Sequence, residues 1–339
     1  MSINLSSCPL LQNLPAFPSE FERLASWHLV GCQICYLIAI FITFISSFKA
    51  VEMVWKKTIF LKSTKFILLL NLFYANMHQI SYAIEASQLL YKHFFLLDRP
   101  CEVQQRDATC APYFQLLIAE CSGLFLCQTG LVIERACATF FKTYEKSKSA
   151  IITIIICLLV IIITSSTGKI LIWDDPLTGY SFSCVSFPKP SLHRANGFYI
   201  VLTCLAFFNM VTTMMIMRYN KHLEYETRFK VGARFRKREA IESTETVCFV
   251  ALSQFVLMFF YCGAVMILLY IRATVASYVF SSWVIWIYSV PFIAMMLPLV
   301  LIYRIRSNRA NRVQIIKSFA ETKHTQEDHI KQMKQTWGE

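Results

Sequence analysis

Residues 150–172 read AIITIIICLLVIIITSSTGKILI, and this stretch decides the class of protein to which the chain belongs. A single charged side chain, that of Lys169, interrupts the run near its end. A helix rises about 1.5 Å per residue, so a run of this length spans a hydrocarbon core about 30 Å thick. The stretch therefore predicts a transmembrane helix.

Six other predominantly apolar stretches of similar length lie along the chain. They cover residues 28–48, 66–90, 113–133, 195–217, 246–271 and 282–303. Together the seven segments predict an all-α membrane protein, a bundle of seven transmembrane helices. An odd number of crossings places the two termini on opposite faces of the membrane.

The connections between these segments alternate in their content of Lys and Arg. Residues 1–27 and every second connection after them carry 7, whereas the other connections and the C-terminal tail carry 25. Cytoplasmic loops of membrane proteins are enriched in Lys and Arg. We therefore expect an extracellular N-terminal segment over 1–27, a transmembrane domain over 28–303 and a cytoplasmic tail over 304–339.

Apolar residues recur among basic ones at the start of the predicted tail. They are Ile305, Val313, Ile316 and Phe319. This spacing is typical of a helix that lies on the membrane surface.

The formal charge of +12 does not point to a nucleic-acid partner, because the basic residues are divided among short loops with no continuous groove. Basic loops suit an anionic lipid bilayer, a cytoplasmic protein partner, or both. The sequence has no nucleophile–base pattern and no cluster of metal ligands. We therefore expect no enzyme activity, no metal and no cofactor.

Four of the 13 cysteines fall in segments assigned to the outside, where disulfides persist: Cys8, Cys101, Cys110 and Cys184. Four cysteines allow three pairings, and sequence alone does not choose among them. We expect Cys110–Cys184, which would hold the second outer loop across the mouth of the bundle, with Cys8–Cys101 as the remainder. Asn4, in Asn4-Leu5-Ser6, is a glycosylation acceptor on the same side.

Two acidic residues lie inside the predicted spans, in the half nearer the outside. Ionisable groups there cost about 2.5–3.5 kcal/mol on insertion scales and are functional candidates. Glu120 fits ligand contact as well as a structural role and is the first candidate for ligand contact, while Glu85 fits an interfacial residue that reaches water better than it fits ligand contact. Gln115 and Trp286 are weaker candidates, and Trp286 also suits an aromatic belt at the interface.

Polar residues also form a stripe along the second span. Asn71, His78 and Glu85 recur every seven residues and share one helix face. We expect this stripe to face other helices, where interhelical hydrogen bonds explain it without a ligand.

The third span ends in Glu134-Arg135, an acid followed by arginine at the predicted cytoplasmic end. The pair resembles the Glu/Asp-Arg pair of G-protein-coupled receptors. It implies that the two side chains pair while the bundle is closed and that opening frees Arg135 for the G protein. The alternative is a basic anchor at the membrane interface.

Longer motifs carry a more specific resemblance. They read LDRPC at 97–101, CAPYF at 110–114, IER at 133–135, STGK at 166–169, WDDP at 173–176, RFKVGARF at 228–235 and TQEDHIKQM at 325–333. In these motifs the chain is similar to the nematode serpentine receptors of class alpha, over nearly its whole length. The resemblance implies a chemosensory receptor at the plasma membrane, in the cilium of a sensory neuron.

The chain also departs from rhodopsin-like receptors. Ala136 replaces the aromatic residue usual after the arginine, the sixth span has no proline, and the seventh lacks the Asn-Pro-x-x-Tyr motif. We therefore do not expect the helices of this chain to move in the same detailed way as those of rhodopsin-like receptors.

These observations predict a G-protein-coupled receptor for an external small-molecule cue. The residues expected to couple to the heterotrimeric G protein are Glu134, Arg135, Arg228, Lys230, Arg234, Arg236, Lys237 and Arg238. A ligand-gated channel or transporter, and a protein that assists the trafficking of another receptor, are the alternatives. Some arthropod chemoreceptor channels have seven spans with an intracellular N-terminus, an orientation that the charges here disfavour. The sequence is compatible with a receptor dimer.

Overall fold

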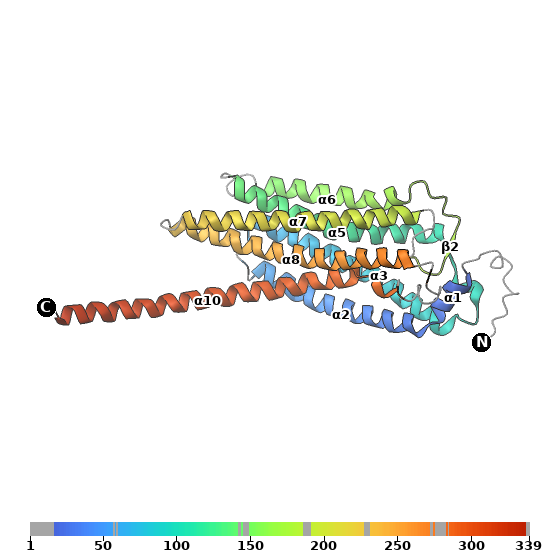
Figure 1. The fold of residues 1–339 in the computed structure, drawn as a ribbon, viewed down its shortest axis with the longest axis horizontal. Coiled ribbons are helices and arrows are strands. Elements are labelled where there is room, and N and C mark those ends of the chain that lie inside the picture. Colours follow the sequence, from blue (N-terminus) through green and yellow to red (C-terminus); the bar gives the residue numbers. More distant parts are fainter. Residues whose placement is uncertain are drawn as a thin grey trace.

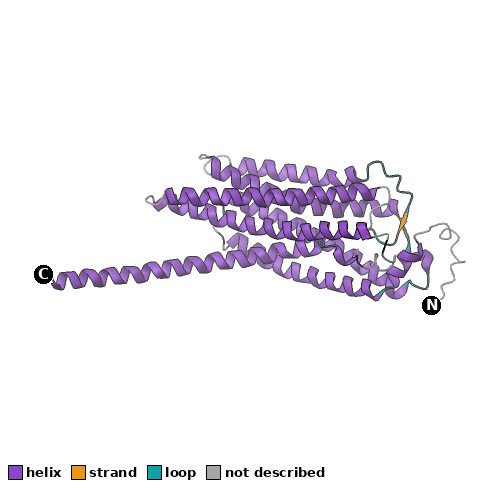
Figure 2. Ribbon diagram, viewed as in Figure 1, coloured by secondary structure: helices purple, strands orange, loops and turns teal. Residues whose placement is uncertain are grey.

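The computed structural model describes residues 17–56, 58, 60–141, 144, 149–185, 191–226, 231–271, 274, 283 and 285–336. Within this part of the chain, seven long helices run roughly side by side (Figure 1, Figure 2). They are α2 (Trp27–Lys56), α3 (Lys62–Phe95), α5 (Asp107–Phe140), α6 (Ser149–Leu171), α7 (Leu192–Glu226), α8 (Val231–Ile271) and α10 (Val290–Thr336). Each predicted span overlaps one of these helices, the seventh after a break near its start, which confirms the seven-helix bundle.

Shorter elements gather at one end of the bundle. They are α1 (Phe17–Ala25), α4 (Pro100–Val103), β1 (Gln105–Arg106) and β2 (Tyr180–Ser181). This end, which also carries the disulfide described below, is called the disulfide end. The opposite end, from which α10 projects, is called the tail end (Figure 1).

The outer surface of the bundle is apolar. In α6, Ile154, Ile155, Leu158 and Ile162 are all at least half exposed. Six of the long helices in the described part of the chain have the length and hydropathy of membrane spans, α6 among them. Apolar surface on this scale is typical of a protein whose solvent is lipid.

Helix α3 is the long helix without such a hydropathic signal, because its polar residues are many. Asn71, His78 and Gln79 are fully buried, while Phe73 and Ile80 point outward and are exposed. The polar stripe therefore faces the other helices, as expected. The expected interhelical hydrogen bonds are not made by Asn71 or His78, whose side-chain polar atoms have no partner in the described structure. Gln79, beside the stripe, makes such bonds instead: it donates to Thr43 Oγ1 of α2 at 2.9 Å and to the carbonyl oxygen of Pro291 at 2.8 Å.

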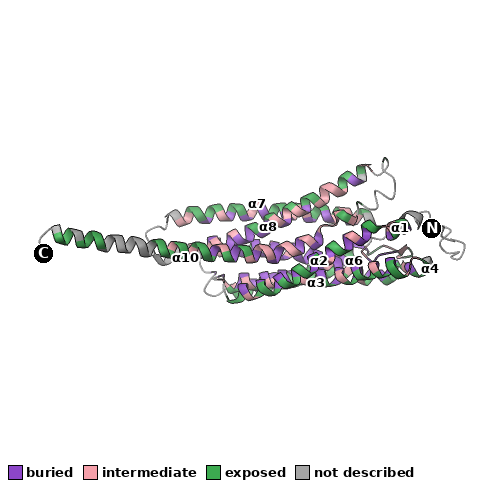
Figure 3. Ribbon diagram, turned by 90° about the horizontal axis from the view of Figure 1, so that it is seen from below, coloured by how far each residue is buried: buried purple, intermediate pink, exposed green. Residues whose placement is uncertain are grey.

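The apolar core lies where the helices face one another (Figure 3). Leu72 of α3, Leu124 and Leu131 of α5, Val250 of α8 and Leu297 of α10 are almost completely buried in it. Glycines in α5 permit the close approach of its neighbours. A Cβ at Gly130 would lie 2.7 Å from Ile156 Cγ2 of α6, so a larger residue would push the two helices apart.

The seventh span is interrupted near its start. Residues 285–287 are helical, Tyr288 and Ser289 are not, and α10 begins at Val290. Pro291 explains the break, because proline has no N–H to donate to the carbonyl four residues earlier and its ring clashes with that carbonyl, whereas proline is tolerated in the first turn of a new helix. The Tyr36 hydroxyl of α2 lies 2.8 Å from the carbonyl oxygens of both Ile285 and Tyr288, so the break is held by α2.

Helix α10 continues through the predicted tail without a turn. No glycine or proline follows Pro298 until the last residues of the chain, so nothing in the sequence ends the helix near Tyr303. The predicted tail is therefore helical, a straight extension of the span that projects beyond the bundle (Figure 1). Its relation to a membrane surface stays a prediction.

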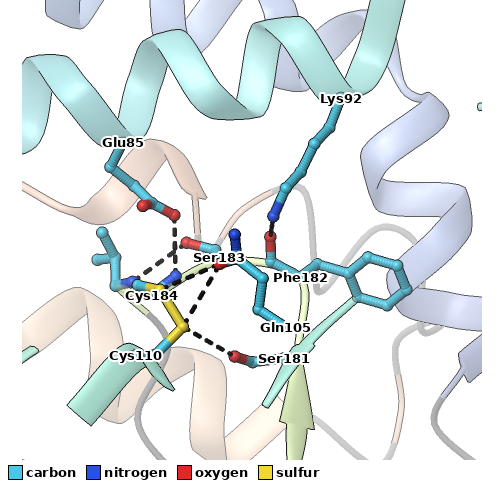
Figure 4. The surroundings of a disulfide bond; sticks show 9 residues. Glu85, Lys92, Gln105, Cys110, Ser181, Phe182, Ser183 and Cys184 are labelled. Atoms are coloured by element: carbon cyan, nitrogen blue, oxygen red, sulfur yellow. Dashed lines mark hydrogen bonds between the residues drawn. A yellow bond between two sulfur atoms is a disulfide. The ribbon is translucent and has the colours of Figure 1, made fainter. Parts of the chain in front are cut away.

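The second outer loop, which follows α6, contacts α3 and α5 at the disulfide end. Cys110 of α5 and Cys184 form a disulfide, the pairing expected from the sequence (Figure 4). Gln105 pairs with Ser181 in the short antiparallel ladder of β1 and β2. Lys92 of α3 donates to the carbonyl oxygen of Phe182 at 2.7 Å.

Other predictions for this end lie outside the description. Asn4 and Cys8 are not among the described residues, and the side chain of Cys101 is not described. The glycosylation site and the second disulfide therefore stay predictions.

Candidate functional site

Glu134 and Arg135 form a buried ion pair near the tail end of α5. Arg135 donates from Nε to Glu134 Oε2 and from Nη2 to Glu134 Oε1, both at 2.6 Å. The arginine side chain is 2% exposed and the glutamate side chain 0%. A buried pair is stable only if its remaining donors and acceptors are also satisfied.

Two other helices supply those partners. Ser63 of α3 donates to Glu134 Oε1 at 2.6 Å, and Arg135 Nη2 donates to Thr64 Oγ1 of α3 at 2.5 Å. Arg135 Nη1 donates to Ser243 Oγ of α8 at 2.9 Å. We call the following residues the Arg135 cluster: Ser63, Thr64, Glu134, Arg135, Tyr144 and Ser243.

Tyr144 completes the Arg135 cluster from the connection between α5 and α6. Its hydroxyl donates to Glu134 Oε1 at 3.2 Å, and the residue is almost completely buried. Burial, together with the negative charge of Glu134, raises the pKa of Tyr144 to about 12, so the phenol keeps its proton at neutral pH. The cluster ties α3, α5 and α8 together and leaves Arg135 inaccessible to a partner.

The other residues expected in coupling lie near α7 and α8. Arg228 and Lys230 are outside the described residues, and Arg234, Arg236 and Lys237 fall within α8 without described side chains. Arg238 Nε lies 3.3 Å from Glu224 Oε1 of α7. It joins the two helices in an exposed ion pair.

Two ion pairs between α8 and α10 were not predicted from the sequence. Glu245 Oε2 lies 2.8 Å from Arg304 Nη2, and Glu242 pairs with Arg312. Arg304 also lies over the ring of Phe249, 4.2 Å from its centroid. We call the pairs Glu245–Arg304 and Glu242–Arg312 the α8–α10 clasp. The two acids are three residues apart on α8 and therefore share a face of that helix, and the two arginines, eight residues apart, share a face of α10. This spacing is the sequence signal from which the two ion pairs could have been predicted.

A second polar site lies within the bundle at Glu120 of α5. Ser81 of α3 donates to Glu120 Oε1 at 2.8 Å, and Tyr113 donates to the Ser81 carbonyl oxygen. Glu120 Oε2 lies 3.9 Å from His78 Nδ1, beyond hydrogen-bond distance. Among the described residues, neither this oxygen nor the two ring nitrogens of His78 has a hydrogen-bond partner.

Aromatic rings from α2, α3, α8 and the break before α10 form a group beside His78. Tyr82 stacks beside it with ring centroids 6.2 Å apart, and Tyr288 lies 5.3 Å from Tyr82. Tyr36 and Tyr261 extend the group, at 5.2 Å from Tyr82 and 6.2 Å from Tyr288. We call this group, together with Ser81 and Glu120, the Glu120 site.

The structure does not bring the other ligand candidates to Glu120. Gln115 precedes Glu120 by five residues on α5, so the two side chains point about 140° apart, and Gly168 of α6 packs on its backbone. Trp286 is 47% exposed, with its ring beside Gly31 of α2. Its neighbour Tyr288 is the aromatic residue that reaches the site.

Glu85 has a different place from the one expected. It is 2% exposed and accepts a hydrogen bond from the backbone N–H of Cys184 at 2.9 Å (Figure 4). The expectation of an interfacial side chain that reaches water is therefore wrong. The loop beyond α6 folds over the bundle and covers this carboxylate, a long-range contact with no local sequence signal.

Comparison with known proteins decides the family. A family model described as serpentine type 7TM GPCR chemoreceptor Sra matches residues 12–337. The chain belongs to this family. The resemblance predicted from the motifs is thereby confirmed.

Curated relatives of the Sra family match nearly the whole chain. Serpentine receptor class alpha-6 of Caenorhabditis elegans is 47% identical over 322 residues, which cover 95% of this chain and 98% of the relative. Class alpha-8 of the same organism is 44% identical over 328 residues, 96% of this chain and 100% of the relative. Class alpha-1 is 38% identical over 322 residues, 95% and 97% of the two chains. Sra receptors are chemoreceptors of the seven-transmembrane type, so the chain is a multi-pass membrane protein.

Proposed function

We propose that the chain is a plasma-membrane chemosensory receptor that binds an external small-molecule cue and signals through a heterotrimeric G protein. The observation that carries the proposal is the Arg135 cluster. In a static bundle, an apolar side chain would fill this position at lower cost than a fully buried arginine held by α3 and α8. The arginine is therefore best explained by a bundle that changes conformation.

In the proposed mechanism the cluster is the closed state of a two-state element. Movement of α8 away from α5 would break the bond to Ser243 and expose Arg135 to the G protein. A cue that binds the open bundle better than the closed one would shift the population toward it. The basic residues of α8, with Arg228 and Lys230 before it, would then contact the same partner.

Two independent features favour the disulfide end as the outer one. Disulfides persist in oxidising compartments, and Cys110–Cys184 lies at that end. The excess of Lys and Arg lies in the connections at the tail end. The proposed ciliary location follows from the chemosensory role.

The test is a response assay in a heterologous cell. Cells expressing the full chain are exposed to soluble and volatile cues, and signalling is recorded with and without a G-protein blocker. We expect a cue response that the blocker removes. A fast current that survives the blocker would contradict the proposal and favour a ligand-gated channel.

A variant series links the response to the cluster. The first variant, Arg135→Ala, leaves Glu134 buried without its countercharge. The double variant Glu134→Gln with Arg135→Gln, called the neutral pair, avoids this. Surface expression is measured for each variant. We expect normal expression of the neutral pair with loss of the cue response, while Arg99→Ala, at an exposed site of the disulfide end, responds normally. A neutral pair that signals like the wild type would remove Arg135 from coupling.

A further inference from the structure

We propose that the cue is a small organic cation, such as a protonated amine, whose charged nitrogen pairs with Glu120 beside the tyrosine rings that adjoin His78. The inference rests on the receptor function proposed above and names the chemical class of its ligand. It starts from the carboxylate. Glu120 is 2% exposed, Ser81 satisfies Oε1, and Oε2 has no hydrogen-bond partner in the described part of the chain.

Glu120 differs in this respect from the other buried glutamates. Glu134 has the guanidinium of Arg135, and Glu85 has the backbone N–H of Cys184. For Glu120 the one basic group nearby in the described structure is His78 at 3.9 Å, and no lysine or arginine pairs with it there. A buried carboxylate without a countercharge is costly, so a cation arriving from outside would remove that cost.

The surrounding rings favour the same class of ligand. The face of a tyrosine ring attracts a cation within about 6 Å of its centroid. Tyr82, Tyr261 and Tyr288 form a connected set beside His78, with centroids 5.3 and 6.2 Å apart. Tyr261 and Tyr288 pack against the core of the bundle and are half-buried.

The composition of the site disfavours other ligands. An anion would be repelled by Glu120 and by the electron-rich ring faces. In the described residues no group of three His, Cys, Asp or Glu side chains is arranged to hold a metal ion. An uncharged ligand would leave the carboxylate without a countercharge. An organic ammonium satisfies the carboxylate and the rings together.

The test measures binding without any G protein, so its result is separate from that of the signalling assay. The purified full chain in lipid nanodiscs is heated with two series of probes of equal shape. One series is isopentylamine, isopentanol and isovalerate, and the other is phenethylamine, 2-phenylethanol and phenylacetate. We expect an amine to raise Tm, with the alcohol and the carboxylate of that series having no effect at equal concentration.

Variants then locate the site. Glu120→Gln should weaken amine binding at least about tenfold, whereas Glu102→Gln, an exposed glutamate of the disulfide end, should bind like the wild type. Tyr288→Phe should keep binding and Tyr288→Leu should weaken it about threefold or more, because the ring face rather than the hydroxyl makes the contact. Tm without ligand reports whether each variant folds.

Three results would overturn the proposal. They are no amine-selective shift in either series, equal stabilisation by amine and alcohol, or undiminished amine binding by folded Glu120→Gln. Amine binding without a G-protein response would instead count against the proposed coupling and leave the ligand class in place.

Discussion

The guanidinium of Arg135 donates hydrogen bonds to residues of three different helices. Glu134 lies beside it on α5, Thr64 on α3 and Ser243 on α8. Of these, the bond to Ser243 is the one that would have to break if α8 moved. A hydrogen bond to a charged group contributes about 1.5–3 kcal/mol, which is enough to bias a two-state equilibrium by a factor of ten or more.

We predict that Ser243→Ala raises signalling in the absence of a cue by roughly tenfold, because Arg135 loses its bond to α8. The measurement is basal G-protein activation normalised to surface expression. Thr244→Val is the matched control. Thr244 is equally buried, but its hydroxyl bonds only to Ala240 of its own helix. Equal basal signalling in both variants would show that the Ser243 bond does not hold the closed state.

At the scale of the elements, two sets of polar contacts join α8 to α5 and to α10, besides the ion pair of Arg238 with Glu224 of α7. The Arg135 cluster joins α8 to α5, and the α8–α10 clasp joins it to the start of the projecting helix. Both attachments lie toward the tail end. The clasp pair Glu242–Arg312 is partly exposed, and such pairs contribute about 0.2–1 kcal/mol, so it is weaker than the bond from Arg135 to Ser243; Arg304 of the other clasp pair is buried.

We predict that reversing one charge of the clasp raises basal signalling two- to fivefold and that restoring the pairing reverses the effect. The variants are Glu242→Arg, Arg312→Glu and the double swap, read by basal G-protein activation. Arg309→Glu reverses a charge on an exposed position of α10 and should have no effect. A double swap that behaves as the sum of its single variants would show that the two side chains are not coupled.

At the scale of the whole molecule, the two ends of the bundle have different chemistry. The disulfide end is closed by a covalent link, a two-residue ladder and the buried contacts of Glu85 and Lys92 (Figure 4). The tail end has no disulfide in the described structure; the polar contacts of the Arg135 cluster and the clasp hold it together with an apolar cluster of Met53, Val54 and Ile305, and such non-covalent contacts can open and re-form. This asymmetry suits a receptor that is rigid outside and switchable inside.

We predict that the chain is glycosylated at Asn4, because the charges place the N-terminus outside. Glycosidase treatment of the cell-expressed protein should increase its gel mobility, and Asn4→Gln should abolish that shift. A sequon placed in the C-terminal tail should remain unmodified. Modification of the tail alone would reverse the proposed orientation.

Hydropathy, charge and motifs in the sequence alone determined the seven helices, the family and the Glu134-Arg135 pair, because these depend on residue type over one local segment. Even the inward-facing stripe of α3 could be predicted, since helical periodicity places Asn71 and His78 on one face. The residues that the candidate side chains meet on other helices could not be predicted. Ser243 meets Arg135, Cys184 covers Glu85 and Tyr288 joins His78 only because distant helices pack together, and that packing depends on side-chain shape across the whole bundle.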